Sequence, residues 1–291
     1  MAALPENSAP PVVLITGCSS GIGHATALRL VTTGRWRVVA TARRTDSLAD
    51  LEHAGCTTLP LDVTSDASMR NAVSAVESTH GAVGALINNA GYSQSGAIET
   101  VPMAQVRAQF ETNVFGVARL IQLVLPGMRR RGSGRIVNLS SMGGTLVFPG
   151  GGYYHATKYA IEAISDALRF EVRPFGIDVV VIQPGLIRSG FAEAAAAGMK
   201  SQLDVADPYG PFNATVAKAT KAAYESGPLS RLAGSPDDVA RVIEEALEAK
   251  RPKTRYRVSA SAHVLMTLRR VLSDRLWDRM VGGSFQIPHT H

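Results

Sequence analysis

The chain has 291 residues, of which 45% are hydrophobic and 19% charged, enough apolar material for one large α/β domain or two small ones. The net charge of +6 is modest and spread without interleaved aromatic residues, which argues against nucleic-acid binding. No apolar run approaches the roughly 18 residues of a membrane span, and the first residues lack the basic-then-apolar order of a signal peptide.

The two cysteines, Cys18 and Cys56, form neither a disulfide framework nor a metal-ligand pattern. We therefore expect a cytoplasmic protein without a bound metal. Residues 1–11 are polar and contain prolines, so they are predicted to be a disordered tail.

The first predicted strand, residues 12–15, runs directly into a glycine-rich turn. The strand is a short β-branched apolar run, and the sequence TGCSSGIG at residues 16–23 follows it and opens a helical pattern. Glycines let the backbone approach a pyrophosphate, and a helix N-terminus offers free N–H groups and a favourable dipole. A glycine turn between a strand and a helix therefore indicates a dinucleotide site.

The second predicted strand, residues 37–41, is followed by Arg43 and Arg44. At this point of a dinucleotide-binding fold an acidic residue holds the ribose 2′-hydroxyl of NAD(H), whereas an arginine accommodates the 2′-phosphate of NADP(H). The arginines favour NADP(H), with NAD(H) possible, unless they are ordinary surface residues.

Strands and helices continue to alternate along the chain. Strands are predicted at residues 57–61, 85–87, 135–139, 178–183 and 256–258, and helices at 66–79, 103–131, 153–173 and 236–249. This order predicts a single α/β domain, a doubly wound parallel sheet of the Rossmann type with helices on both faces and ligands at the strand carboxyl ends.

Tyr154 and Lys158 are four residues apart on a predicted helix, so their side chains lie on one face. A free phenol has a pKa of about 10, and a nearby cation lowers that pKa into the range useful for acid–base catalysis. Such a pair is more often an ordinary surface pair. Ser141, thirteen residues upstream at a strand end, favours a catalytic site instead.

Asn113 lies amid apolar residues of the helix predicted at 103–131. An asparagine amide competes for backbone hydrogen bonds inside a helix. It predicts a local kink or a polar function at this point.

Taken together, these motifs resemble the short-chain dehydrogenase/reductase family over residues 12–258, nearest to its hydroxysteroid and retinol dehydrogenase-like members. The turn at 16–23 resembles the family's TGxxxGIG, residues 88–91 its NNAG, and residues 184–189 its PGxIxT with a serine in the threonine position. Asn113, Ser141, Tyr154 and Lys158 fall where the family has its catalytic tetrad.

The resemblance implies a role for each residue of the tetrad. Tyr154 would exchange a proton with the substrate oxygen, and Ser141 would hydrogen-bond that oxygen. Lys158 would lower the tyrosine pKa and hold the nicotinamide ribose, while Asn113 would order a water that links Lys158 to solvent. Cofactor contacts are implied for Gly17, Ser19, Ser20, Gly21, Ile22, Arg43, Arg44, Asp62, Val63, Asn89, Ala90, Gly91, Tyr154, Lys158, Pro184, Gly185, Ile187 and Ser189.

The function that the resemblance implies is an NADP(H)-dependent oxidoreductase, which interconverts a ketone or aldehyde and an alcohol by hydride transfer. Its substrate would be bulky and apolar, such as a steroid, a retinoid or a lipid. The alternative is a catalytically idle NADP(H)-binding regulatory protein on the same fold, although the intact tetrad argues against it.

The family commonly pairs two long helices across a two-fold axis, so a homodimer or homotetramer is expected. Candidates for that contact, or equally for the core, are Leu120, Val124, Ile161, Ile164 and Leu168.

Two later segments have less regular patterns. By the resemblance, residues 186–230 would form a substrate lid. The last segment, residues 259–291, extends beyond the common family core and carries apolar residues at helical spacing with arginines between them. A basic amphipathic helix of this kind can lie on a membrane surface, but it more often packs on its own core.

Overall fold

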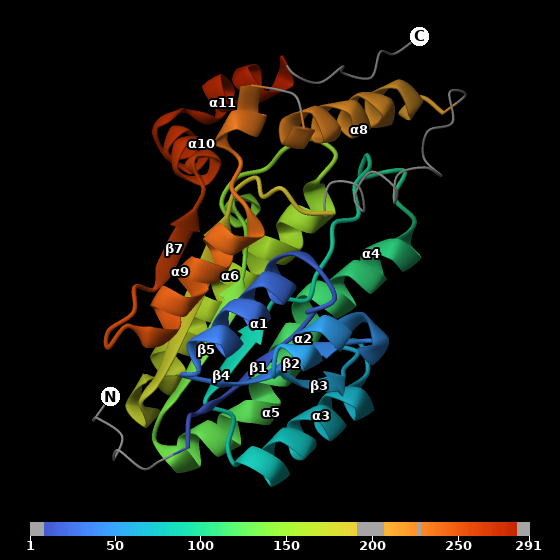
Figure 1. The fold of residues 1–291 in the computed structure, drawn as a ribbon. Coiled ribbons are helices and arrows are strands. Elements are labelled where there is room, and N and C mark those ends of the chain that lie inside the picture. The colour runs from blue at the N-terminus through green and yellow to red at the C-terminus, as the bar shows by residue number, and fades with distance from the viewer. Residues whose placement is uncertain (1–8, 191–206, 226–227, 284–291) are drawn as a thin grey trace.

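The structure is a computed structural model that describes residues 9–190, 207–225 and 228–283. Seven parallel strands form one sheet in the order β3-β2-β1-β4-β5-β6-β7 (Figure 1). The strands are β1 (Val12–Ile15), β2 (Arg37–Ala42), β3 (Thr57–Pro60), β4 (Ala85–Asn88), β5 (Gly134–Leu139), β6 (Ile177–Pro184) and β7 (Arg255–Val258). Each predicted strand is present within one residue of its predicted ends, and the doubly wound Rossmann fold is confirmed.

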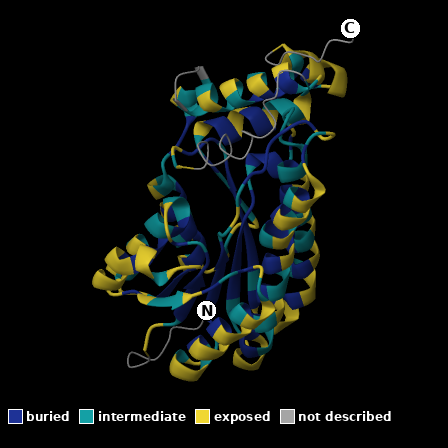
Figure 2. Cartoon of the chain, turned by 90° about the vertical axis from the view of Figure 1, so that its right-hand side faces the viewer, coloured by how far each residue is buried: buried dark blue, intermediate teal, exposed yellow. Residues whose placement is uncertain are grey.

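Helices cover both faces of the sheet. One face carries α1 (Gly21–Thr33), α2 (Ala49–His53) and α9 (Pro236–Glu248), and the other carries α3 (Asp66–His80), α5 (Gly116–Arg131) and α6 (Gly152–Val172). Shorter elements are η1 (Thr45–Leu48), α4 (Met103–Phe110), η3 (Met142–Gly144) and η4 (Arg173–Phe175). Figure 2 shows the buried strands in the middle and the exposed helix surfaces outside.

Strand β1 explains why both faces are covered. Successive side chains of a strand point to opposite faces, so Val13 belongs to the core beneath α1 and α9, and Leu14 to the core beneath α3, α5 and α6. Both side chains are fully buried, as expected for a parallel strand with helices on each side.

The strand order reverses between β1 and β4, and this reversal positions the ligand site. The connections from β1 and from β4 leave the sheet in opposite directions, so a crevice opens at the carboxyl ends of these two strands. The glycine turn follows β1, and residues Asn89 to Gly91 follow β4.

The long helix predicted at residues 103–131 is interrupted, as Asn113 indicated. A π-helical turn, η2 (Glu111–Phe115), separates α4 from α5. The Asn113 amide accepts from the backbone N–H of Tyr92 at 3.1 Å and donates to the Tyr92 carbonyl at 2.8 Å. The Asn113 side chain is thus bound to the loop after β4 at the point where the helix widens, and π-helical turns of this kind frequently occur at functional sites.

A third layer lies over the carboxyl edge of the sheet (Figure 1). It consists of α8 (Gly210–Glu225), η6 (Pro228–Leu232), α10 (Ala260–Val271) and α11 (Asp274–Gly282). Leu265 and Trp277 are buried there in a cluster with Met142 and Leu186 from the sheet edge. Part of the apolar stripe of the C-terminal segment therefore packs on the body of the protein, whereas Val264 and Val271 are exposed. Of the lid predicted at 186–230, residues 191–206 and 226–227 lie outside the described residues.

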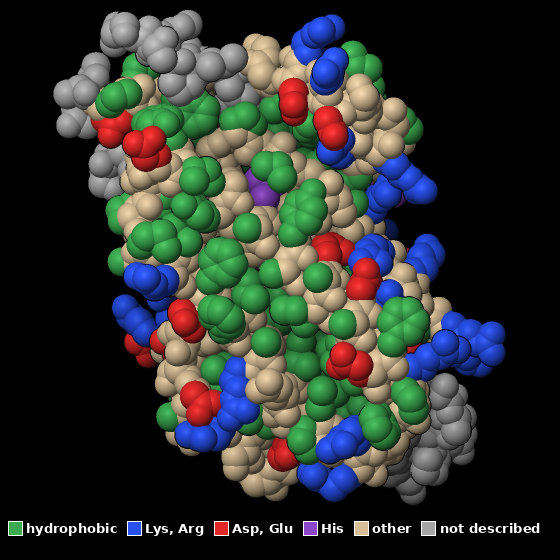
Figure 3. All heavy atoms as spheres, turned by 180° about the vertical axis from the view of Figure 1, so that it is seen from behind, with side chains coloured by type: hydrophobic (Ala, Val, Ile, Leu, Met, Phe, Trp, Pro, Cys, Tyr) green, Lys and Arg blue, Asp and Glu red, His purple; other side chains and the backbone are tan. Residues whose placement is uncertain are grey.

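The apolar residues predicted for helix pairing belong mainly to the core. Leu120, Val124, Ile161 and Leu168 are buried against the sheet. Hydrophobic side chains also gather on the outer surface of the face that points away from the viewer in Figure 1 (Figure 3). Exposed large apolar residues on or next to α5 and α6 are Phe115, Tyr159, Phe170 and Phe175. No helix in the described ranges combines the length and the apolar character needed to cross a bilayer.

Candidate active site

Ser141 and Tyr154 meet at the carboxyl edge of the sheet. Ser141 follows β5 and caps η3, where its hydroxyl accepts from the backbone N–H of Gly143 at 3.0 Å. Tyr154 lies in the first turn of α6, and its phenol is hydrogen-bonded to Ser141. Part of the Tyr154 surface remains accessible, yet the protein around its phenol raises the pKa to about 12, and the bond to Ser141 offsets part of that rise.

The Lys158 ammonium lies beneath the tyrosine ring. It donates to the Leu139 carbonyl at 2.7 Å and lies 5.8 Å from the centroid of the Tyr154 ring. Burial lowers the pKa of Lys158 to about 8, and the negative charge of Glu162 opposes that effect. Tyr154 does not have the low pKa expected beside a cation, because burial outweighs the hydrogen bond to Ser141, which lowers that pKa. At neutral pH the site therefore combines a protonated phenol with an ammonium group.

Asn113 approaches the same site from η2. Besides its two bonds to Tyr92, its amide donates to the Thr157 hydroxyl at 3.1 Å. A Cβ atom added at Gly91 would lie 3.1 Å from Asn113 Oδ1 and 3.8 Å from Lys158 Nζ. The structure thus brings together all four residues of the predicted tetrad and the loop after β4.

The glycine turn is fastened to the loop after β4. The Asn89 amide donates to the carbonyls of Thr16 and Gly17 at 2.8 and 3.0 Å. Gly17 has φ +71°, a left-handed conformation that favours glycine. A Cβ atom at Gly23 would lie 2.3 Å from the Gly17 carbonyl oxygen. The first turn of α1 has no acidic residue, and Ser20 makes no side-chain cap there. This cradle fits the pyrophosphate of a dinucleotide.

Two arginines follow β2, and their surroundings differ. Arg43 is exposed and has no ion pair within the described ranges, and its charge acts on the Tyr92 phenol by opposing the rise that burial causes in that pKa. Arg44 forms an ion pair with Asp46 at 3.6 Å, with both side chains more than four-fifths exposed. Arg43 is therefore the more available cation for a 2′-phosphate.

The remaining predicted cofactor residues follow strands β1, β3 and β4 at the carboxyl edge of the same sheet. Asp62 accepts from the backbone N–H and the hydroxyl of Thr64 at 2.9 and 2.8 Å. Val63 is buried, and its carbonyl oxygen lies 2.4 Å from where a Cβ atom at Gly116 would stand. Within the glycine turn, Ser19 and Ser20 are exposed, Gly21 has a positive φ, and Ile22 packs on the core. From the loop after β4, the backbone N–H of Ala90 donates to the Thr16 hydroxyl.

The segment from Pro184 to Ser189 closes the crevice from the side of β6. The backbone N–H of Gly185 donates to the Val258 carbonyl at 2.9 Å, and Ile187 forms a bridge with Gly234. Ser189 lies next to the glycine turn, because its Cβ atom is 3.7 Å from the position of a Cβ atom added at Gly21. This segment, for which the resemblance implies cofactor contacts, is thus close to the glycine turn.

His155 supports the loop that carries Ser141, a function that the sequence did not indicate. Its Nε2 accepts from the backbone N–H of Phe148 at 3.2 Å, so Nδ1 carries the proton and donates to the Gly143 carbonyl at 3.0 Å. Burial lowers the pKa of His155, which keeps the ring in this neutral form.

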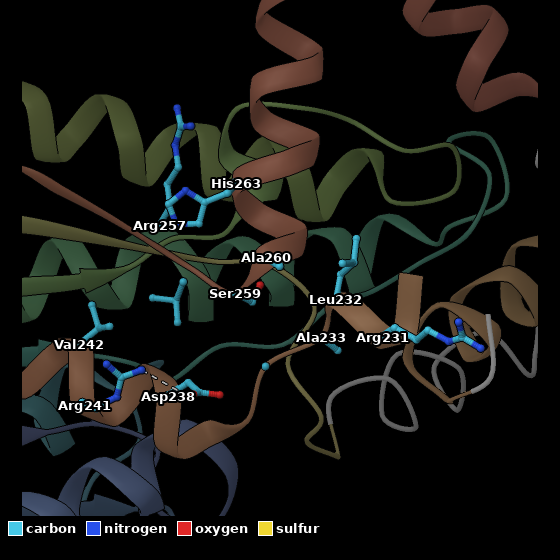
Figure 4. Close-up of a pocket in the computed structure, with 12 residues that line it drawn as sticks. Arg231, Leu232, Ala233, Asp238, Arg241, Val242, Arg257, Ser259, Ala260 and His263 are labelled. Atoms are coloured by element: carbon cyan, nitrogen blue, oxygen red, sulfur yellow. Dashed lines mark hydrogen bonds and ion pairs between the residues drawn. The ribbon is translucent and has the colours of Figure 1, made fainter. Parts of the chain in front are cut away.

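A separate cavity of about 370 Å³ lies between η6, α9, β7 and α10 (Figure 4). No residue of the predicted tetrad lines it. Arg231, Arg241 and Arg257 border it, but their side chains point in different directions, and Arg241 pairs with Asp238 at 3.4 Å. This cavity is therefore distinct from the candidate active site and has no converging set of donors.

Comparison with known proteins identifies the class to which this fold and site belong. Residues 11–200 match the family described as short chain dehydrogenase, and the chain belongs to that family. The protein is accordingly an NAD(P)-dependent oxidoreductase acting on CH–OH and C=O groups, as the resemblance implied.

Several relatives match the chain over most of its length. It is 36% identical over 272 residues to the uncharacterised oxidoreductase YbbO of Escherichia coli (strain K12), covering 93% of this chain and 94% of that protein. It is 32% identical over 296 residues to human retinol dehydrogenase 8, covering 98% and 90%. It is 34% identical over 258 residues to human 17-beta-hydroxysteroid dehydrogenase type 1, covering 84% and 76%.

Solved structures show the same architecture. A short-chain dehydrogenase from Streptomyces avermitilis has a TM-score of 0.74 and 34% identity, covering 95% of this chain and 98% of that one. A short-chain dehydrogenase/reductase from Burkholderia phymatum in complex with NAD has a TM-score of 0.75 and 25% identity, covering 97% of both chains.

Proposed function

We propose that the protein interconverts a ketone or aldehyde and an alcohol on a bulky apolar substrate, with NADP(H) as its cofactor. The observation that carries this proposal is the Tyr154 phenol, bonded to Ser141 and backed by the Lys158 ammonium, beside a glycine turn that fits a dinucleotide. An idle NADP(H)-binding regulator would not need this arrangement of proton donor and cation.

The chemistry follows from the protonation states of the site. With its pKa near 12, Tyr154 holds its proton at neutral pH and can donate it to a substrate oxygen on which negative charge develops. Ser141 donates a second hydrogen bond to that oxygen, and the Lys158 charge stabilises the phenolate that remains. When bound, the nicotinamide gives or accepts the hydride. Asn113 would order a water beside Lys158 that returns the proton from solvent.

The preference for NADP(H) rests on Arg43. Its guanidinium has no carboxylate partner within the described residues and presents a planar fork of donors that suits a phosphate. We assign the pyrophosphate to the glycine turn, the adenine to Asp62 and Val63, and the nicotinamide end to Lys158 and the Pro184–Ser189 segment.

The apolar substrate class rests on the third layer. Trp277 and Phe148, whose ring centroids are 6.1 Å apart, pack in the cluster that includes Met142, next to Ser141. Tyr224 of α8 packs against the same cluster, and its phenol is close enough to Tyr154 for that neighbour to add to the rise that burial causes in the pKa of Tyr224. Two relatives are named for retinol and hydroxysteroid substrates, which are of this apolar kind.

A panel of ketones, aldehydes and alcohols, including steroids, retinoids and long-chain lipids, tests the proposal. Turnover is followed at the nicotinamide absorbance with NADPH and with NADH. Tyr154→Phe should lower kcat by a factor of about 10²–10⁴ and leave NADPH affinity nearly unchanged, because only the transferable proton is lost. Tyr159→Phe, an exposed tyrosine on the same helix, is the matched control.

Two outcomes would contradict the proposal. Near-full activity of Tyr154→Phe would show that another group supplies the proton. A wild-type protein that binds NADPH tightly and turns over no member of the panel would favour the idle regulator.

We also propose a cytoplasmic homodimer or homotetramer. The free, buried thiols of Cys18 and Cys56 suit a reducing compartment. The exposed aromatic residues on and beside α5 and α6 supply apolar surface that a second copy of the chain would cover.

A further inference from the structure

A buried carboxylate lies one helical turn beyond Lys158, and the mechanism above gives it no function. Glu162 follows Lys158 at position i+4 of α6, so both side chains lie on one face of the helix. The Glu162 side chain is only 9% exposed. An ionised carboxylate buried to this extent is unfavourable unless it has charged or hydrogen-bonding partners.

Three elements surround the Glu162 side chain. Arg255 of β7 donates to one carboxylate oxygen at 2.9 Å, and Gln183 of β6 donates to the other at 3.0 Å. From η3, a Cβ atom at Gly144 would lie 2.9 Å from Glu162 Cγ. The carboxylate is therefore fixed against the loop that begins at Ser141.

The charges continue outward in alternating sign. The Arg255 guanidinium pairs with Asp166 at 2.8 Å, and Arg169 pairs with the same carboxylate at 2.8 Å. Side-chain exposure increases along this line, from 9% at Glu162 to 32% at Arg255 and 44% at Asp166. The line thus runs from the catalytic lysine to the protein surface, with each charge beside one of opposite sign.

We propose that Glu162, held by Arg255 and Gln183, is a positioning residue that keeps the Lys158 ammonium charged and in place at the catalytic site. This inference rests on the proposed function, because it assigns Glu162 a part in the same proton transfer. The other groups around the ammonium, namely the Tyr154 phenol, the Leu139 carbonyl and the Asn113 amide, are neutral.

The charges of Glu162 and Arg255 should change the pKa of Lys158 in opposite directions. Burial lowers the pKa of Lys158 to about 8, and Glu162 raises it against that effect. Loss of the Glu162 charge should therefore let Lys158 lose its proton at lower pH. Loss of the Arg255 charge should do the opposite, because the full negative charge of Glu162 would then act on Lys158.

Direct titration of Lys158 tests this inference. The sequence has six lysines, so NMR of protein labelled with ¹³C at lysine Cε resolves them, and Lys158→Ala assigns the signal. Glu162→Gln should lower the titration midpoint of Lys158 by about one pH unit. Arg255→Gln should raise it, and Glu171→Gln, an exposed position on the same helix, should leave it unchanged.

The pH dependence of the reduction rate should shift in the same directions as the Lys158 midpoint in the two variants. The alkaline limb of the reduction rate, where the tyrosine–lysine pair loses a proton, should shift to lower pH in Glu162→Gln and to higher pH in Arg255→Gln. A merely structural disturbance would not give shifts of opposite sign.

Two results would overturn the inference: an unchanged Lys158 midpoint in Glu162→Gln, or shifts in the same direction for both variants. If Glu162→Gln does not fold, the direction of the shift in Arg255→Gln decides. If the wild type turns over no substrate, the proposed function fails, and the NMR titration still decides whether Glu162 acts on Lys158.

Discussion

Replacing Arg43 gives the sharpest test of cofactor choice. The structure leaves its guanidinium without an ion pair in the described ranges, whereas Arg44 is already paired with Asp46. A charge-assisted hydrogen bond contributes about 1.5–3 kcal/mol. At about 1.4 kcal/mol per tenfold, Arg43→Ala should weaken NADPH binding roughly 10- to 100-fold. NADH has no 2′-phosphate, so its affinity should change by less than about threefold.

The assay is a titration of each reduced cofactor, followed by its fluorescence, for the wild type and three variants. Arg44→Ala is the control and should cost NADPH less than about threefold, because an exposed charge already paired with a neighbour contributes little. Arg43→Asp should weaken NADPH further and spare or improve NADH, since an acid repels phosphate and accepts ribose hydroxyls. The difference in affinity between NADPH and NADH should become smaller at high salt, because salt screens the attraction between Arg43 and the 2′-phosphate.

Two results would refute this reasoning. A wild-type protein that binds NADH as tightly as NADPH has no residue that recognises the phosphate. A larger loss in Arg44→Ala than in Arg43→Ala would transfer the contact to Arg44.

Three further predictions follow from the described geometry. Gly23→Ala should abolish cofactor binding or folding, because its Cβ would lie 2.3 Å from a backbone oxygen, and thermal unfolding with and without NADPH separates the two outcomes. His155→Phe should lower kcat with little change in NADPH affinity. Because burial lowers the pKa of His155, the imidazole takes up a proton at higher pH in the unfolded chain than in the folded protein. The free energy of unfolding of the wild type should therefore decrease as the pH falls below about 6.5, and that of His155→Phe should decrease less. Light scattering at micromolar concentration should find a dimer or tetramer, and Phe170→Glu, at a side chain 71% exposed on α6, should weaken it; a wild-type monomer would contradict the assembly.

The sheet could be predicted from the sequence because its signals are local. Strands such as β1 and β6 are short runs of mainly β-branched residues, and the flanking turns contain glycine, proline or asparagine, so patterns of a few residues fix the ends. The interruption at η2 was also local, since a single Asn113 in an apolar helix indicated it. The tetrad residues could be predicted because their spacings within and between elements match the family.

What could not be predicted depends on contacts between distant parts of the chain. Helix α8 was expected to be part of a loosely structured lid; its Asn213 accepts from the backbone N–H of Ala97, which lies 116 residues away. The bond between Glu162 and Arg255 spans 93 residues. The raised pKa of Tyr154 was likewise missed, because residue spacing gives the nearby cation but not the degree of burial.

The attachment of α10 to the loop after β6 has a consequence for protein engineering. The Ser261 hydroxyl accepts from the backbone N–H of Leu186 at 2.9 Å, and a Cβ atom at Gly185 would lie 2.4 Å from that hydroxyl oxygen. The C-terminal segment can be exchanged between relatives to change the substrate range. If the two sequences are joined directly after β7, the exchange also replaces Ser261, the partner of the Leu186 N–H. Chimeras joined after Ser261 keep this hydrogen bond, and should vary the apolar cluster of α10 and α11 without disturbing the backbone at Gly185 and Leu186.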